Sequence, residues 1–148
     1  MDIKELGLKY KLDRDNDVWD CHGNWIISHN AIEKIMAIEG FYTEQITSLY
    51  QDATSCRLII RVTNKDGEAM ITIGEADSSN CKNKYYGAMA EKRGIDRAVL
   101  KLINAYEHGI YSDVEADSFK KPASRTPEEQ KQAYRDYPAI DCTTPNKY

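Results

Sequence analysis

The sequence predicts an α+β protein, and three observations support this fold class. Two runs rich in β-branched residues, joined by a short Asn/Asp/Gly turn, are typical of an antiparallel β-hairpin. A longer segment after the hairpin repeats its apolar residues with helical spacing. The chain has 148 residues, enough for one domain with its own core. We therefore expect an antiparallel β-sheet packed against a long helix.

Weaker signals precede the hairpin. Apolar residues alternate loosely with polar ones near the N-terminus, at Leu6, Leu8, Tyr10 and Leu12. A short apolar run follows at 25–27. We predict a short helix over 31–39, because apolar residues recur there at helical spacing, a polar cap is available at 28–30, and Gly40 is suited to end the helix. Alternating polarity at 44–50 favours a strand.

The hairpin is predicted over 56–75. Its runs at 56–63 and 68–75 are rich in Ile, Val and Thr, and the turn between them reads Asn-Lys-Asp-Gly. Gly74 lies near the end of the second run. A glycine inside a strand adds no side chain to the packing, so Gly74 predicts a bulge or a close approach of another backbone.

The long helix is predicted over about 85–106. One apolar stripe, which we expect to lie on the sheet, contains Ala88, Ile95, Ala98, Val99, Leu102 and Tyr106. The opposite side carries Arg93, Arg97 and Lys101 at successive steps of four. We expect this basic side to face water or a partner.

The end of the chain differs in composition from the rest. Ser112 and Glu115 have the spacing of a capping box, which predicts a short acidic helix. All four prolines lie after residue 120, among polar residues. We therefore divide the chain into one α+β domain, 1–119, and a largely extended tail, 120–148, with a short helix at 127–137. Such a tail either docks on a protein partner or stays solvated.

The charge is unevenly distributed. The whole chain carries a formal net charge of −4, which by itself does not suggest nucleic acid as a partner. The segment 82–101, however, has six basic residues against two acidic ones. A row of cations on a helix, with Lys82 and Lys84 in the preceding loop, suits a phosphate backbone. We expect Tyr86 to be exposed and to stack on bases; the alternative is an ordinary solvated helix face.

Several kinds of chemistry lack their usual motifs. The four cysteines are widely spaced and form no CxxC pair, so we expect no metal site. Phosphate-loop, dinucleotide-binding, hydrolase-elbow and zinc-protease motifs do not occur, and we expect no cofactor. Glu91 falls near the apolar stripe, and we expect it to pair with Arg57 or Arg61. No apolar run is long enough to span a membrane, so we expect a cytoplasmic protein.

The order of elements resembles a known family. A capped helix, a strand, the hairpin and a polar loop lead to a basic helix, which reads Ala90-Glu91-Lys92-Arg93-Gly94-Ile95-Asp96-Arg97-Ala98-Val99-Leu100-Lys101. Over roughly 28–117 the chain resembles the single-strand annealing proteins, which include phage recombinases of the Red-beta, ERF and Sak types and the eukaryotic annealing mediator. It also looks like a group of small phage and bacterial proteins.

The resemblance implies a fold, an activity and a set of site residues. In that family a hairpin sheet packs on a long helix, and single-stranded DNA binds without ATP in a groove between them, often in rings or filaments. Carried over to this sequence, phosphates would be contacted by Lys82, Lys84, Arg93, Arg97 and Lys101. Arg57 or Arg61 would line the groove from the sheet.

Three hypotheses of function follow. The first is a non-enzymatic protein of the annealing type, which binds single-stranded DNA and forms homo-oligomers in a bacterial host. The second is a protein-interaction module, such as a phage inhibitor or assembly factor, which binds through its acidic surface and its tail. The third, less favoured, is a metal-dependent nuclease that uses scattered carboxylates, namely Glu68, Glu75, Asp77, Asp113, Glu115 and Asp117.

Overall fold

The protein has the predicted α+β architecture. The computed structural model describes residues 2–21, 23–114 and 126–140. Along the chain its elements are α1 (Ile3–Tyr10), β1 (Val18–Cys21), β2 (Asn24–Ile27), α2 (His29–Glu39), β3 (Tyr42–Asp52), β4 (Ser55–Thr63), β5 (Ala69–Asp77), α3 (Tyr86–Leu102), the 3-10 turn η1 (Tyr106–His108), β6 (Ile110–Ser112) and α4 (Pro127–Asp136).

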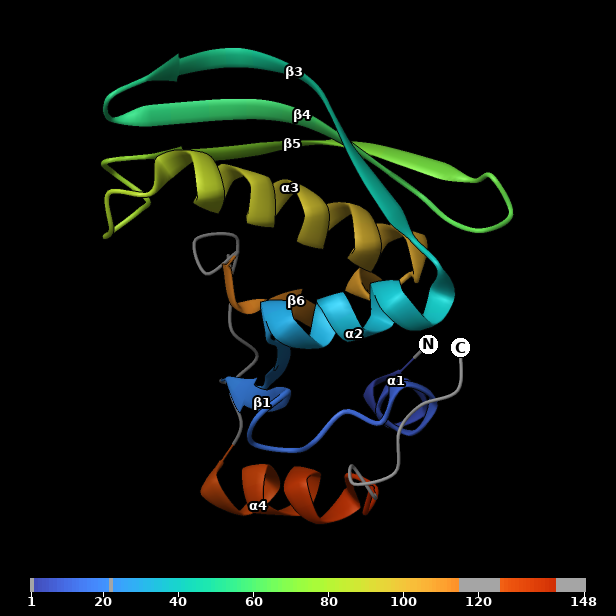
Figure 1. Ribbon diagram of the computed structural model, residues 1–148. Coiled ribbons are helices and arrows are strands. Elements are labelled where there is room, and N and C mark those ends of the chain that lie inside the picture. The colour runs from blue at the N-terminus through green and yellow to red at the C-terminus, as the bar shows by residue number, and fades with distance from the viewer. Residues whose placement is uncertain (1, 22, 115–125, 141–148) are drawn as a thin grey trace.

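The larger sheet has the order β3-β4-β5 and is antiparallel throughout. The predicted hairpin is confirmed as β4 and β5, in a register that places Ile59 opposite Ile73. The strand predicted at 44–50 is also confirmed, and β3 is longer than expected. Alternate residues of β4, from Cys56 to Val62, are buried against the core. Figure 1 shows α3 running along this covered face of the sheet.

Two glycines let α3 lie directly on the sheet. A Cβ at Gly74 of β5 would overlap the carbonyl oxygen of Ala90 and lie 2.8 Å from the amide nitrogen of Gly94. The hydroxyl of Thr72 also donates to the carbonyl oxygen of Gly94, at 2.6 Å. The close backbone approach predicted at Gly74 is therefore confirmed.

The predicted sheet-facing stripe of α3 is partly wrong. Ala88, assigned to that stripe, is exposed, whereas Ala90 and Gly94 are buried against β5. The reason is that α3 is covered on more than one side. Figure 1 shows α3 between the large sheet on one side and α2 with β6 on the other, and α3 contacts all of these elements. A single-stripe interpretation assumes one covered face, and this helix has two.

A second, smaller sheet has the order β1-β2-β6. The strands β1 and β2 are antiparallel, and β2 pairs in parallel with β6, with Trp25 opposite Ile110. The predicted helix at 31–39 is confirmed as α2. The hydroxyl of Ser28 caps it by accepting from the amide of Ala31 at 3.1 Å, and Gly40 ends it with φ of 69°.

Several predicted boundaries change. The loose alternation at the N-terminus belongs to a helix, α1, which buries Leu6 and Tyr10 and leaves Leu8 59% exposed. The helix α3 ends at Leu102, earlier than predicted. Ser112 lies in β6 with its side chain buried, and its predicted capping partner, Glu115, is outside the described residues.

The segment predicted as a tail contributes to the core. Its helix is confirmed as α4, capped by the hydroxyl of Thr126. Tyr137, directly after α4, is 7% exposed and donates from its hydroxyl to the carbonyl oxygen of Leu12 at 2.7 Å. Tyr134 and Tyr137 both pack on Trp25, with ring centres 5.6 Å away. The prediction that this segment lies outside the core is therefore wrong for 126–140.

Candidate nucleic-acid interface

The start of α3 presents an exposed basic and aromatic group. Lys82 and Lys84 are exposed in the loop before the helix, and Tyr85 is 73% exposed. The loop holds its shape through Asn83, whose side-chain oxygen accepts from the amide of Tyr85 at 2.8 Å. We call these three residues, Lys82, Lys84 and Tyr85, the α3 entry.

The N-terminus of α3 also lacks the cap that the other described α-helices have. Asp2 caps α1, Ser28 caps α2 and Thr126 caps α4, each through a side-chain oxygen. The residue before α3, Tyr85, makes no side-chain cap, and the first turn contains no acidic residue. The unpaired amides and the positive end of the helix dipole therefore meet no anion from their own helix.

The exposed tyrosine at the start of α3 is Tyr85 and not Tyr86. We predicted Tyr86 as the exposed ring, but Tyr86 is partly buried and packs against the core, whereas Tyr85 is exposed. The cause is the second covered side of α3, which places residue 86 over the interior. Any stacking on bases at this end of α3 therefore falls to Tyr85.

Arg93 does not lie on an open face. It is 8% exposed, and its guanidinium donates to the carbonyl oxygens of Glu75, Asn80 and Val114 at 2.8, 2.6 and 2.8 Å. It also donates to the side-chain oxygen of Asn80 at 2.8 Å. These bonds join β5, the loop after it and the segment after β6, so Arg93 has a structural role in the described fold.

The remaining residues of the predicted basic row differ from one another. Arg97 is partly exposed and donates to the carbonyl oxygen of Ile73 at 2.7 Å. Lys101 is exposed near the end of α3. Arg93 and Arg97 together reach the carbonyls of Ile73 and Glu75, which lie two residues apart on β5 and so point to the same side of the strand. The row therefore covers part of an edge strand.

Arg57 and Arg61 project from the sheet face that α3 does not cover. They alternate along β4 with the buried residues that face the helix. Arg57 lies 3.1 Å from the carboxylate of Glu75, and Arg61 lies 3.2 Å from that of Glu44. The expected pairing of either arginine with Glu91 is thus not found, and Glu91 is exposed. The sheet and α3 pack directly on each other, so these arginines do not line a groove between them.

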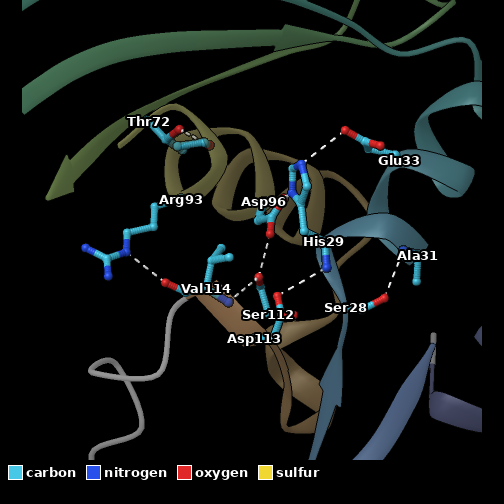
Figure 2. A network of polar contacts seen from close by, with 11 residues as sticks. Ser28, His29, Ala31, Glu33, Thr72, Arg93, Asp96, Ser112, Asp113 and Val114 are labelled. Carbon is cyan, nitrogen blue, oxygen red and sulfur yellow. Dashed lines mark hydrogen bonds and ion pairs between the residues drawn. The ribbon is translucent and has the colours of Figure 1, made fainter. Parts of the chain in front are cut away.

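A buried polar cluster packs beside α3, and nothing in the sequence predicted it. Figure 2 shows His29, at the start of α2, directed at Asp96 on α3, with Ser112 of β6 reaching the same carboxylate. The Nδ1 of His29 lies 2.6 Å from one oxygen of Asp96, and the hydroxyl of Ser112 donates to the other at 2.5 Å. The side chains of Asp96 and Ser112 are fully buried. Only the packing of α2, α3 and β6 brings these residues together.

The electrostatics of this cluster favour a protonated histidine. The hydrogen bond to the Asp96 carboxylate, with the charges of Asp96 and Glu33, raises the pKa of His29 despite partial burial. Asp113 accepts from the amide of His29 at 3.1 Å, and burial and then the charge of Asp96 raise the pKa of Asp113. Because Ser112 donates to Asp96 and not to His29, the three side chains do not form a nucleophilic triad.

The described residues contain no group of His, Cys, Asp and Glu side chains that could hold a metal ion. Two of the carboxylates named for a nuclease, Glu115 and Asp117, lie outside those residues. Within the same part of the chain, no helix is long and apolar enough to cross a membrane.

Comparisons with known proteins do not assign the chain to a family. No family model, no curated protein and no solved structure matches it.

Proposed function

We propose that this protein binds single-stranded DNA, in an ATP-independent manner of the annealing type, at the α3 entry. One observation carries the proposal. Two exposed lysines and one exposed tyrosine directly precede a helix N-terminus that has no side-chain cap and no acid in its first turn. Amides at a helix N-terminus favour a phosphate, lysines add sequence-independent attraction, and an exposed ring stacks on an unpaired base.

The exposed side of α3 extends this path. Lys92 is exposed and lies seven residues after Tyr85, so the two side chains are on the same side of the helix, two turns apart. Exposed Ala88 lies between them, and its small side chain leaves room for a strand of DNA. Glu91, beside Lys92, reduces the positive charge locally, and exposed Lys101, nine residues after Lys92, lies on the opposite side of the helix and does not extend this path.

Three of the arginines predicted to contact DNA are engaged in contacts within the fold, so they are not suitable for testing the proposal. Arg93 is buried in backbone contacts, and Arg57 and Arg61 are ion-paired on the uncovered sheet face. Substituting Arg93 would disturb the fold as well as any DNA contact. The useful variants are therefore in the α3 entry, where the side chains are exposed.

Fluorescence anisotropy with labelled oligo(dT) at two salt concentrations tests the proposal. We expect Lys82→Gln with Lys84→Gln to weaken binding by about tenfold, and Tyr85→Ala by a similar factor. The lysine double variant should also reduce the slope of log affinity against log salt by about 1.4, since each phosphate contact to a single strand contributes about 0.7. A matched control is Lys4→Gln with Lys65→Gln, which removes two exposed cations elsewhere. Absence of wild-type binding at low salt, or equal losses in both double variants, would overturn the proposal.

A protein-interaction module is the second candidate function, and the large sheet favours it. Seven large hydrophobic side chains are exposed in the described residues, and five of them, Tyr42, Ile46, Leu49, Ile71 and Ile73, belong to β3 and β5. The edge of β5 is partly covered by Arg93 and Arg97. In the described part of the chain, β3 pairs only with β4, so its other edge is open. An open edge strand with apolar side chains is a typical site of strand addition.

The partner that we propose for this edge is a second copy of the chain. Four charged side chains of the uncovered sheet face form the pairs Arg57–Glu75 and Arg61–Glu44. These pairs have no net charge and so do not repel an identical surface. The proposal agrees with a homo-oligomer and is independent of DNA binding.

Sedimentation velocity over a range of concentrations tests this second candidate. We expect reversible self-association of the wild type and a monomer when Ile46→Lys and Leu49→Lys are combined, because two charges on the edge strand oppose pairing. Leu8→Lys, on exposed Leu8 of α1, is the matched control and should associate like the wild type. A wild type that stays monomeric at every concentration would exclude self-association.

A further inference from the structure

A hollow at the opposite end of the molecule from the large sheet concentrates positive charge. It lies between the loop that precedes β1 and the helix α4, which Figure 1 shows on the far side from β3, β4 and β5. The hollow has a volume of about 420 Å³ and is lined by Arg14, Asp15, Lys131, Tyr134 and Arg135. A second hollow, of about 390 Å³, adjoins it and shares four of these residues.

The charge of this hollow is opposite to that of the chain. Three of its lining side chains are cations and one is an acid, whereas the whole protein carries a formal net charge of −4. Lys131 and Arg135 lie four residues apart on α4, so they are neighbours on one side of that helix. Arg14 comes from a distant part of the sequence and faces the same hollow. These three cations lie near one another only because α4 docks beside the loop that contains Arg14.

Arg14 is held in position before any ligand binds. Its Nη1 donates to the carbonyl oxygen of Tyr134 at 3.2 Å, and its guanidinium carbon lies 5.5 Å from the centre of the Tyr134 ring. Its Nε lies 3.6 Å from the carboxylate of Asp15. Within the described residues these contacts leave Nη2 available as a donor. A fixed guanidinium with a free donor loses little conformational entropy when it binds an anion.

The other two cations are also available. Lys131 is exposed and has no hydrogen-bonding or ionic partner in the described parts of the chain. Arg135 is exposed and donates only to the side-chain oxygen of Gln132, at 2.9 Å, among those residues. Neither cation is therefore neutralised by a carboxylate there.

The floor of the hollow is fixed by contacts to the core. The hydroxyl of Tyr134 accepts from the amide of Asp20 at 2.9 Å, and its ring packs edge-on against Trp25. The helix itself is held by Tyr137, whose hydroxyl bonds to the backbone of Leu12. These aromatic contacts place the backbone of α4, and with it the positions from which Lys131 and Arg135 extend, relative to Arg14.

We propose that this cationic hollow, formed by Arg14, Lys131 and Arg135, binds the phosphate group of a nucleotide or of a nucleic-acid backbone. Three convergent cations suit a multiply charged phosphate better than a single carboxylate, and guanidinium groups match the geometry of phosphate oxygens. The site is separate from the α3 entry and does not depend on it. Two of its three cations, Lys131 and Arg135, belong to the segment whose composition alone predicted a tail.

Isothermal titration calorimetry with pyrophosphate, with dAMP and with oligo(dT) tests the inference on the full chain. We expect Lys131→Gln with Arg135→Gln to weaken pyrophosphate binding by about tenfold or more, which corresponds to the loss of about 1.4 kcal/mol. Lys4→Gln with Lys65→Gln, the matched control, should bind like the wild type. Because the substituted side chains are exposed, thermal unfolding of both double variants should match that of the wild type.

The other outcomes are also decisive. Pyrophosphate and dAMP binding that depends on Lys131 and Arg135 identifies a nucleotide as the source of the phosphate, and dependence for oligo(dT) alone identifies a nucleic-acid backbone. Equal affinities of all variants for every probe would overturn the inference. The variant with Lys82→Gln and Lys84→Gln, measured in parallel, separates the two proposals. If its affinity for oligo(dT) is unchanged, the proposal that DNA binds at the α3 entry is overturned, whereas the proposal for the cationic hollow is not affected.

Discussion

Arg93 and His29 show how burial decides what a charged residue does. Arg93 belongs to the most basic segment of the chain, yet its guanidinium is bound to main-chain carbonyls inside the fold. His29 has no metal-ligand or catalytic motif around it in the sequence, yet its ring lies against a fully buried carboxylate, that of Asp96. In both cases neighbours that are distant in sequence determine the role.

His29 predicts a pH dependence of stability. The hydrogen bond that His29 donates to Asp96 raises the pKa of His29 in the folded state above the ordinary value of 6.5. Protonation therefore stabilises the fold: the contribution is complete below the unfolded pKa and is lost as pH rises through the folded one. We expect the free energy of unfolding in urea to fall in the wild type as the pH rises above 6.5, and to fall less in His29→Gln.

A second substitution controls this measurement. His108 is exposed on η1, and His108→Gln should retain the pH dependence of the wild type. Asp113, whose pKa is also raised, is present in all three proteins, and because the charge of His29 lowers the pKa of Asp113, the difference between the wild type and His29→Gln reports on His29 together with its effect on Asp113. The same pH slope in the wild type and in His29→Gln would contradict the prediction.

At the scale of elements, α3 and the large sheet form one closely packed unit. The absence of a side chain at Gly74 brings the helix backbone against β5, and this places Arg93 and Arg97 within reach of the strand's carbonyls. Covering these carbonyls reduces the tendency of the β5 edge to pair with another strand. The proposed self-association is therefore assigned to β3, at the other edge.

Gly74 and Gly87 form a matched pair for testing this packing. Gly74→Ala is expected to lower the free energy of unfolding by about 3 kcal/mol, because the added methyl group would overlap the backbone of α3. Gly87 lies in α3, and a Cβ there meets nothing within 4 Å. Gly87→Ala should therefore raise stability by about 0.5 to 1 kcal/mol. Chemical denaturation checks both values, and similar stabilities of the two variants would show that α3 does not rest on Gly74.

The two ends of the described chain pack together, because the segment of α4 docks on α1 and on the residues that follow it. Tyr137 fills a space over Gly7 of α1, where a Cβ would overlap its hydroxyl. Tyr134 and Tyr137 contact Trp25 from two directions. A segment more than a hundred residues from α1 in sequence thus completes the core around it. The cationic hollow exists only in this closed arrangement.

Tyr137 supplies a graded test of this closure. Tyr137→Phe keeps the ring and removes the hydrogen bond to Leu12, and it should cost about 1 kcal/mol of stability. Tyr137→Ala removes the buried ring as well and should cost about 3 kcal/mol or more. Near-UV circular dichroism should also change in Tyr137→Ala, because Trp25 loses a packed ring. Wild-type stability of Tyr137→Ala would show that α4 does not stabilise the core.

The sequence predicted most of the local structure correctly. The hairpin, the short helix at its Ser28 cap, the helix after Thr126 and the close approach at Gly74 all depend on neighbouring residues and their backbone preferences. The candidate site was predicted less well. Lys82 and Lys84 are exposed, as DNA binding requires, but the exposed tyrosine is Tyr85 and not Tyr86. Arg93 is bound to main-chain carbonyls, and Arg57 and Arg61 form ion pairs.

The fold class, the order of the main elements and the position of the most basic segment can be predicted from the sequence, because these follow from periodicity, capping and charge along the chain. Which basic residues are exposed could be seen only in the folded protein, since this depends on the second covered side of α3. The tertiary structure also decided that 126–140 docks on the core, because three aromatic rings bury enough surface to offset the polar composition around them. Which side chains meet is a property of packing, and a single sequence does not specify it.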